Sequence, residues 1–154
     1  QLLLRPGILK GFSKNHEAGF LYGYIYTDDV KENRPTLQLT DVFLQSPSNV
    51  ISLRNRLEFR IREDQDARSI RYRAALRWQH NISEVLGLVL WDEPFLNITN
   101  EKWTGDRVFE RNRLFLGSSI KFDVIRLEAG YMNQFTPRKD TSIIEHILTF
   151  YLFY

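Results

Sequence analysis

Two neighbouring stretches of the chain carry arginine at alternate positions. The first contains Arg54, Arg56, Glu58, Arg60 and Arg62, and the second contains Arg71, Arg73 and Arg77. A guanidinium stays charged and pairs bidentately with carboxylates or phosphates. Gathered on one face, such residues could form an internal ladder of ion pairs, a path that prefers anions, or a site for an acidic headgroup.

The positions that alternate with these arginines are apolar, except Asn55. They are Ile51, Leu53, Leu57, Phe59 and Ile61 in the first stretch, and Ile70, Tyr72, Ala74, Leu76 and Trp78 in the second. A period of two predicts an antiparallel hairpin over residues 50–79 with a polar turn at 63–68. Each strand is long enough to cross a bilayer when tilted. In a membrane barrel the apolar face meets lipid and the arginines face the lumen, whereas in a lipocalin-like soluble barrel the apolar face lines a pocket.

Composition narrows the classes of function. The 154 residues predict a single barrel domain over 1–154, and the absence of cysteine excludes disulfides and thiolate sites. A net charge of +2 gives no support for nucleic-acid binding. The 15 arginines against 6 lysines favour an internal ladder over a solvated surface. Because the chain starts at Gln1 without a methionine, we expect a processed or truncated form whose signal peptide has been removed.

Alternation along the chain predicts nine strands. They cover residues 1–12, 18–26, 36–45, 50–62, 69–79, 84–97, 107–119, 124–135 and 143–154. Long polar loops are predicted at 27–35, 98–106 and 136–142, and Pro94 predicts a bulge or strand end at 92–94. Short and long connections alternate, as in outer-membrane barrels. Since single-chain bacterial barrels have even strand numbers, we expect ten strands with one upstream of Gln1, or eight.

Near both ends of the chain, aromatic and apolar residues occupy alternate positions and therefore lie on one face of a predicted strand. Phe20, Tyr22, Tyr24 and Tyr26 lie on one face of their strand and suit contact with lipid. At the other end, Phe150, Leu152 and Tyr154 follow Leu148 on one parity. This ending is similar to the C-terminal assembly signal of outer-membrane barrels, and it predicts the barrel-assembly machinery as a partner during biogenesis.

On the membrane hypothesis, each Arg or Lys on the lipid face near the midplane would cost ~2–4 kcal/mol. The charged residues are therefore assigned to the lumen: Arg54, Arg56, Glu58, Arg60, Arg62, Arg71, Arg73, Arg77, Glu93, Arg113, Arg126, Glu128 and Glu145. We expect Glu58 and Glu128 to bridge arginines on neighbouring strands, because buried charges must be paired. Stacked arginines would largely fill a narrow lumen.

Asn55, Asn133 and His146 interrupt the apolar parity. Unsatisfied polar groups are costly in lipid, so these residues are candidate contacts with lipid or between protomers of a homo-oligomer. The alternative is placement at the membrane interface or at a bulge that re-aims the side chain.

Catalytic residues are not predicted. His16, His80 and His146 share no motif with a serine, and no metal-ligand spacing occurs. Ser118, Ser119 and Ser142 could belong to a lipid hydrolase or acyltransferase at the outer rim, but ordinary strand or loop positions are favoured. We expect no enzyme activity, no metal and no cofactor.

The chain resembles the bacterial domain of unknown function 2490 family, whose members are described as outer-membrane barrels. The resemblance is carried by residues 3–7, the Arg54 to Arg60 series, residues 71–73, Asp92, Glu93, Phe95 and Asn97, residues 111–113, Gly117, residues 130–132, Gln134 and His146. The third strand departs from it, with Thr40, Asp41 and Val42 where a Glu-x-Arg is expected. The resemblance implies an antiparallel up-and-down transmembrane β-barrel in the outer membrane of a Gram-negative bacterium.

The sequence thus favours a non-enzymatic, self-associating and lipid-interacting outer-membrane barrel with an arginine-rich, occluded lumen. Two alternatives stay open. One is a narrow, porin-like channel that prefers anions, and the other is a soluble carrier of an apolar ligand.

Overall fold

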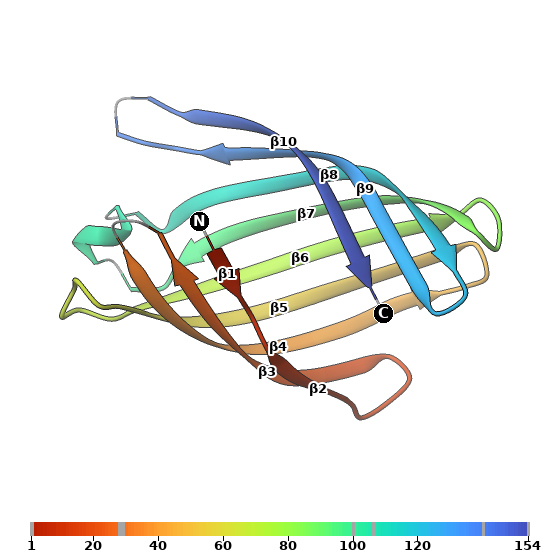
Figure 1. Ribbon diagram of the computed structural model, residues 1–154, viewed down its shortest axis with the longest axis horizontal. Coiled ribbons are helices and arrows are strands. Elements are labelled where there is room, and N and C mark those ends of the chain that lie inside the picture. The colour runs from red at the N-terminus through yellow and green to blue at the C-terminus, as the bar shows by residue number, and fades with distance from the viewer. Residues whose placement is uncertain (1, 28–29, 100, 106, 140, 154) are drawn as a thin grey trace. The chain divides into compact units, whose positions relative to one another are not determined.

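The computed structural model describes residues 2–27, 30–99, 101–105, 107–139 and 141–153. They form an all-β, antiparallel protein with one short 3-10 helix, η1 (Lys102–Thr104) (Figure 1). The strands are β1 (Leu2–Leu4), β2 (Gly7–Gly11), β3 (His16–Tyr26), β4 (Lys31–Gln45), β5 (Asn49–Arg62), β6 (Ser69–Asn81), β7 (Leu86–Asn97), β8 (Phe109–Phe122), β9 (Ile125–Thr136) and β10 (Ile143–Phe153). No helix among these residues is long and apolar enough to cross a membrane.

The strands pair in chain order, from β1 through β3 and onward to β10. The strand predicted over residues 1–12 is divided into β1 and β2, which both pair with β3. Arg5 and Pro6 separate them, and the Pro6 carbonyl accepts a hydrogen bond from the Tyr22 amide at 2.8 Å. β1 and β2 together occupy one strand position beside β3. The described residues therefore form nine strand positions, of which β1 is the first and β10 the last.

The chain groups into two compact units. Unit 1 comprises Gln1–Asp41, Arg54–Ala74 and Phe95–Glu110, and unit 2 comprises Val42–Leu53, Ala75–Pro94 and Arg111–Tyr154. Unit 1 therefore contains the connections at 63–68 and 98–108, and unit 2 contains the short turns at 46–48, 82–85 and 123–124.

The long loop predicted at residues 27–35 is wrong. β4 already begins at Lys31, and its register with β3 runs from Tyr26 opposite Lys31 to His16 opposite Asp41. Proline lacks an amide hydrogen and usually argues against a strand. Here Pro35 lies opposite Tyr22, whose own amide is bonded away from β4 to Pro6. Pro35 therefore removes no hydrogen bond between β3 and β4.

The interruption predicted at residues 92–94 is also wrong, because β7 is continuous from Leu86 to Asn97. Glu93, Phe95 and Asn97 are all buried and continue one parity past Pro94. Packing on that face outweighs the single donor that proline removes from the ladder.

Both units place apolar side chains on the exposed face of their strands. In unit 1, Phe20 and Leu37 are about half exposed, while Glu32 and Glu58 are buried, Glu58 completely. In unit 2, Leu116 is 59% exposed and Leu148 77% exposed. This distribution is the reverse of the usual one, in which charged side chains are almost never fully buried.

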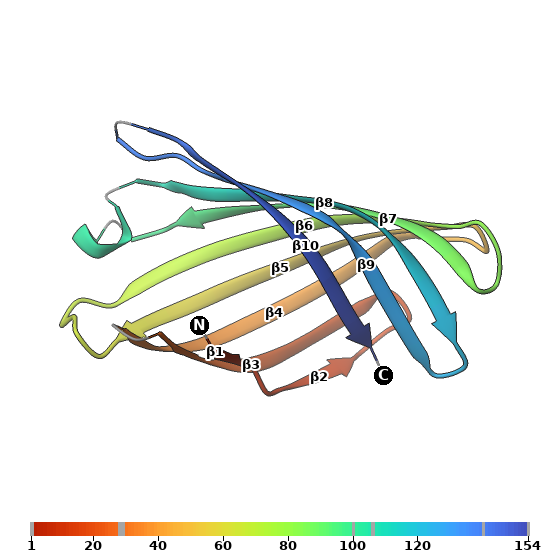
Figure 2. The same cartoon turned by 45° about the horizontal axis from the view of Figure 1, so that its top comes forward.

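Unit 2 also has a small apolar cluster on its buried face. Val89, Phe115 and Met132 form its centre, and Trp91 stacks on Phe115 with ring centroids 5.2 Å apart. Their strands, β7, β8 and β9, are successive in the strand order and can be followed in Figure 2. Gly117 and Gly130 are register partners on β8 and β9, and a Cβ on Gly130 would lie 2.7 Å from Cζ of Phe115. Glycine at this pair thus leaves room for the Phe115 ring.

Candidate functional site

Glu58 of β5 is the centre of a buried ion-pair network in unit 1. Its carboxylate accepts hydrogen bonds from Nε of Arg71 at 2.8 Å and from Nη1 of Arg73 at 2.6 Å. Nη2 of Arg5 lies 3.9 Å from the same carboxylate. The expected bridge from Glu58 to arginines of the neighbouring strand, β6, is therefore present. Three guanidinium groups share one fully buried carboxylate.

The network continues through two further glutamates. Arg71 donates to Glu110 at 2.9 Å, and Arg60 lies 3.4 Å from Glu110. Arg60 also donates to Glu32 at 2.8 Å, and Glu32 pairs with Arg34 at 2.8 Å. Ion pairs thus connect β4, β5, β6 and the start of β8 within unit 1.

Sequence reasoning missed four members of this network, Arg5, Glu32, Arg34 and Glu110. Glu32 and Arg34 fell in a stretch that was assigned to a long polar loop over residues 27–35. A usable signal was present, since Glu32, Arg34, Thr36 and Gln38 are polar residues on one parity, and Leu37 and Leu39 follow on the other. Gln38 in fact accepts a hydrogen bond from Arg56 at 2.8 Å.

Aromatic rings cover the guanidinium planes of the network. The guanidinium carbon of Arg73 lies 4.2 Å from the centre of the Phe95 ring, and that of Arg60 lies 4.8 Å from the centre of Trp103. Trp103 belongs to η1, and its indole donates to the Ala67 carbonyl at 3.2 Å in the turn between β5 and β6. Stacking of this kind is attractive and leaves the edge donors available for carboxylates.

Arg62 ends β5 and turns away to the connection beyond it. It donates to both oxygens of Asp64, at 2.9 and 2.6 Å. These hydrogen bonds lower the pKa of Asp64, an exposed residue of the turn, to about 2. Arg62, assigned to the lumen from the sequence, thus pairs with a turn carboxylate.

Unit 2 has its own ion pairs around Glu128. Both terminal nitrogens of Arg77 bind the Glu128 carboxylate, at 3.0 and 2.5 Å, and Nε of Arg126 lies 3.3 Å from it. The expectation of a partner on a neighbouring strand is wrong here, because Arg77 is on β6 and Glu128 on β9, three places along the strand order. A long arginine side chain on the buried face can reach beyond the adjacent strand.

The other residues assigned to the lumen are buried or half-buried, except Glu145, which is exposed although it lies opposite the buried Gln134. Arg113 donates to Gln134 at 2.7 Å, and Gln134 in turn donates to Glu145. Glu93 is 2% exposed, and Arg54 is half-buried.

Two of the polar residues on the apolar parity have partners in their own chain. The Tyr72 hydroxyl donates to the Asn55 side chain at 2.5 Å, and His146 is hydrogen-bonded to the Tyr131 hydroxyl. Asn133 lies opposite His146 and Leu114 in the register. The partners of Asn55 and His146 satisfy polar groups that the sequence had suggested for contacts with a second protomer.

The histidines considered for catalysis come from different strands, and His16 and His80 have partners of other types. His16 contacts Asp41, with Nδ1 and Oδ1 2.7 Å apart, and His80 is hydrogen-bonded to Asn49 at 3.0 Å. Ser119 is buried on β8. Among the described residues, no group of three or more His, Asp or Glu could hold a metal ion. Of the assembly-signal residues, Phe150 and Leu152 are exposed on β10, and Tyr154 lies outside the described residues.

Known proteins give two points of comparison. A solved structure titled "Bacterial polysaccharide outer membrane secretin" matches with a TM-score of 0.63 at 13% identity, over 95% of this chain and 52% of that one. The chain thus spans about half of that protein, and at such identity the likeness concerns the fold alone. No curated protein matches. The profile described as "Protein of unknown function (DUF2490)" matches residues 1–144, and the chain therefore belongs to this family.

Proposed function

We propose that the chain is a non-enzymatic β-barrel protein of the bacterial outer membrane. In this proposal the exposed apolar face meets lipid and the arginine-glutamate network occupies the lumen. The observation that carries the proposal is the reversed distribution of side chains in each unit. Glu58 is 0% exposed in unit 1, and Leu148 is 77% exposed in unit 2.

The apolar and the charged face of the strands differ in their free-energy cost in water and in lipid. Strands whose exposed face is lined by Leu, Phe and Tyr invite aggregation in water. The same face is stable against hydrocarbon, whereas an Arg there would cost ~2–4 kcal/mol near the midplane. Burying Glu58 among arginines avoids an unpaired charge in a medium of low dielectric constant. A fold similar to that of a protein titled as an outer-membrane secretin is consistent with this location.

A comparison of boiled and unboiled protein on a gel tests the proposal. The chain is expressed with a secretion signal, extracted from the outer-membrane fraction in mild detergent, and run before and after heating. A stable barrel migrates differently when it stays folded, so a heat-shifted band is expected. Unshifted protein that remains monodisperse in buffer without detergent would contradict the proposal and favour a soluble carrier of an apolar ligand.

An anion-preferring channel is the second candidate, and the surplus of arginine around Glu58 favours it. Arg5, Arg71 and Arg73 all approach this one carboxylate. Single-channel recording in planar bilayers would show an anion-selective current whose selectivity falls in Arg73→Glu. A folded protein without conductance would leave the occluded barrel as the better description.

Self-association is part of the proposal. The unboiled gel is expected to show a discrete larger species in addition to the folded monomer. Because Asn55 and His146 have partners in their own chain, Asn133→Leu is the informative substitution, with Asn15→Leu in an exposed turn as its control. An unchanged larger species in Asn133→Leu would exclude Asn133 from the contact.

A further inference from the structure

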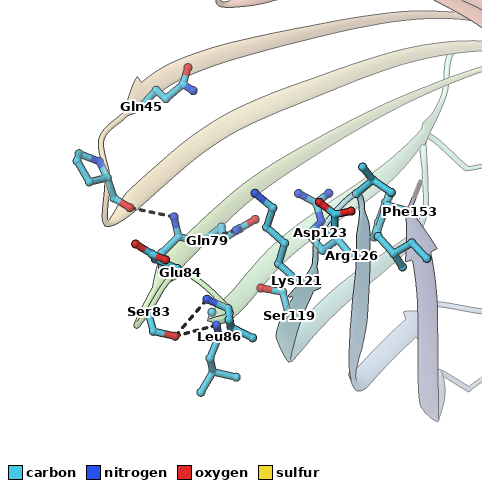
Figure 3. A pocket seen from close by; sticks show the side chains of 16 residues that line it. Gln45, Gln79, Ser83, Glu84, Leu86, Ser119, Lys121, Asp123, Arg126 and Phe153 are labelled. Atoms are coloured by element: carbon cyan, nitrogen blue, oxygen red, sulfur yellow. Dashed lines mark hydrogen bonds between the residues drawn. The ribbon is translucent and has the colours of Figure 1, made fainter.

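A cavity of about 780 Å³ lies wholly within unit 2, near its short turns. Its lining comes from β4 and from β6 to β10, together with the turns before β5, β7 and β9 (Figure 3). The polar part of the lining includes Gln45, Gln79, Asn81, Ser119, Lys121 and Arg126. This volume lies in the range of about 300–1,000 Å³ typical of small-molecule sites.

Two cations of the lining have capacity for a further partner. Nε of Arg126 lies 3.3 Å from the Glu128 carboxylate, and in the described part of the chain the terminal nitrogens of Arg126 have no hydrogen-bond partner. Likewise, Lys121 forms no ion pair with any described carboxylate. Figure 3 shows both side chains reaching the cavity, Lys121 from β8 and Arg126 from β9. A guanidinium and an ammonium at one cavity can together bind a compact anion.

The surroundings hold Arg126 in place. Its guanidinium carbon lies 4.5 Å from the centre of the Phe153 ring, so the ring covers the face of the group and leaves its edge free. Gln79 is fixed at both ends, because it accepts from Arg77 at 3.1 Å and donates to Asn81 at 2.8 Å. Fixed donors reduce the ordering cost of binding.

Carboxylates at the rim limit which anions fit. Glu84 and Asp123 line the same cavity and offset the two cations. The lining therefore has no surplus of positive charge that would attract anions without selectivity. Val85, Leu86 and Ile125 supply an apolar wall. This combination suits a small solute with one anionic group and an apolar portion.

We propose that this cavity is a binding site for a small amphipathic anion, a phosphate or carboxylate joined to an apolar group, held by Arg126 and Lys121. This function goes beyond that of a filled barrel. Two sources share the chemistry, a free solute and the headgroup of an anionic lipid.

Titration calorimetry on the folded protein in a neutral detergent tests the site, with phenyl phosphate as the probe and phenol as its uncharged counterpart. Saturable binding of phenyl phosphate, but not of phenol, is expected. In the double variant Lys121→Gln with Arg126→Gln the affinity should fall at least about tenfold, because two charge-assisted contacts are lost. The matched control is Lys10→Gln with Arg68→Gln, which removes two exposed cations of unit 1 and should bind as the parent does.

Absence of saturable binding to the parent protein would overturn the proposal, and so would equal affinity in the double variant or equal binding of phenol. Where Arg126→Gln fails to give the heat-shifted band, Lys121→Gln alone is used, since Lys121 is exposed. Unchanged affinity in that variant also contradicts the site. The heat shift is measured separately, so a failed titration leaves the proposed function standing.

Competition identifies the source of the anion. Displacement of phenyl phosphate by inorganic phosphate supports a free solute. Displacement only by phosphatidic acid added to the micelles supports a lipid headgroup. Failure of both to compete would contradict an anion site.

Discussion

At the scale of single residues, the main feature is a carboxylate shared by several guanidinium groups. Glu58 is fully buried and hydrogen-bonded to Arg71 and Arg73. Removing one partner of a buried pair leaves an uncompensated charge, which costs much more than the pair itself contributes. The ion pair between Arg62 and Asp64 is exposed and screened by water, so its loss is expected to change the stability of the fold little.

Glu58→Gln is therefore expected to destabilise the folded protein by roughly 3–5 kcal/mol, because Arg71 and Arg73 both lose a fully buried carboxylate partner. Urea-induced unfolding in lipid vesicles, followed by tryptophan fluorescence, measures the change. The control is Asp64→Asn, which should leave the unfolding midpoint where it was. A Glu58→Gln midpoint equal to that of the parent would show that the network is hydrated enough to tolerate the loss.

At the scale of elements, β8 and β9 approach each other through two glycines. Gly117 and Gly130 are register partners, and added Cβ atoms would meet backbone of the opposite strand and the Phe115 ring. Phe115 is completely buried and packs on Trp91 and Tyr151. The close approach of these strands thus depends on the missing side chains.

Gly130→Ala should destabilise the protein by about 1–3 kcal/mol through overpacking against Phe115. Gly11→Ala is the matched control, because Gly11 is also a strand glycine and a Cβ there would meet only the Ser13 carbonyl at 3.9 Å. Both variants are compared by the temperature at which the unboiled band disappears. Equal temperatures would mean that β8 and β9 separate at little cost.

At the scale of the whole molecule, the proposed membrane location makes a prediction that a soluble protein would not share. Leu116 lies on β8, and Val108 lies just before the first residue of that strand. Each is 59% exposed. In water, arginine at either position would be tolerated. In a bilayer, only a residue on the lipid face of a strand is penalised.

Leu116→Arg is expected to cost ~2–4 kcal/mol if Leu116 lies near the midplane, and to reduce the amount of heat-shifted protein in the outer-membrane fraction. Val108→Arg, at equal exposure in the loop, should assemble normally. The two variants are compared by quantifying the shifted band. Equal assembly of both would contradict a lipid-facing β8.

The sequence by itself determined the central hairpin and the face on which its charged and apolar side chains lie. Strict alternation from Arg54 to Arg77 indicated a hairpin, and the structure has β5 and β6 there with a turn at 63–68. Alternation is enough for this because successive side chains of a strand point to opposite faces.

The pairing of residues distant in sequence was decided only by the tertiary structure. No local pattern connects Arg77 with Glu128 or Arg71 with Glu110, since these partners come from strands that are not adjacent. Glu32 and Arg34 were assigned to a polar loop over residues 27–35, and the register with the partner strand β3 placed them in β4. The cavity beside Arg126 likewise exists only once six strands are assembled. Local sequence fixes which face a residue occupies, whereas its partner depends on the order and register of strands that long-range packing sets.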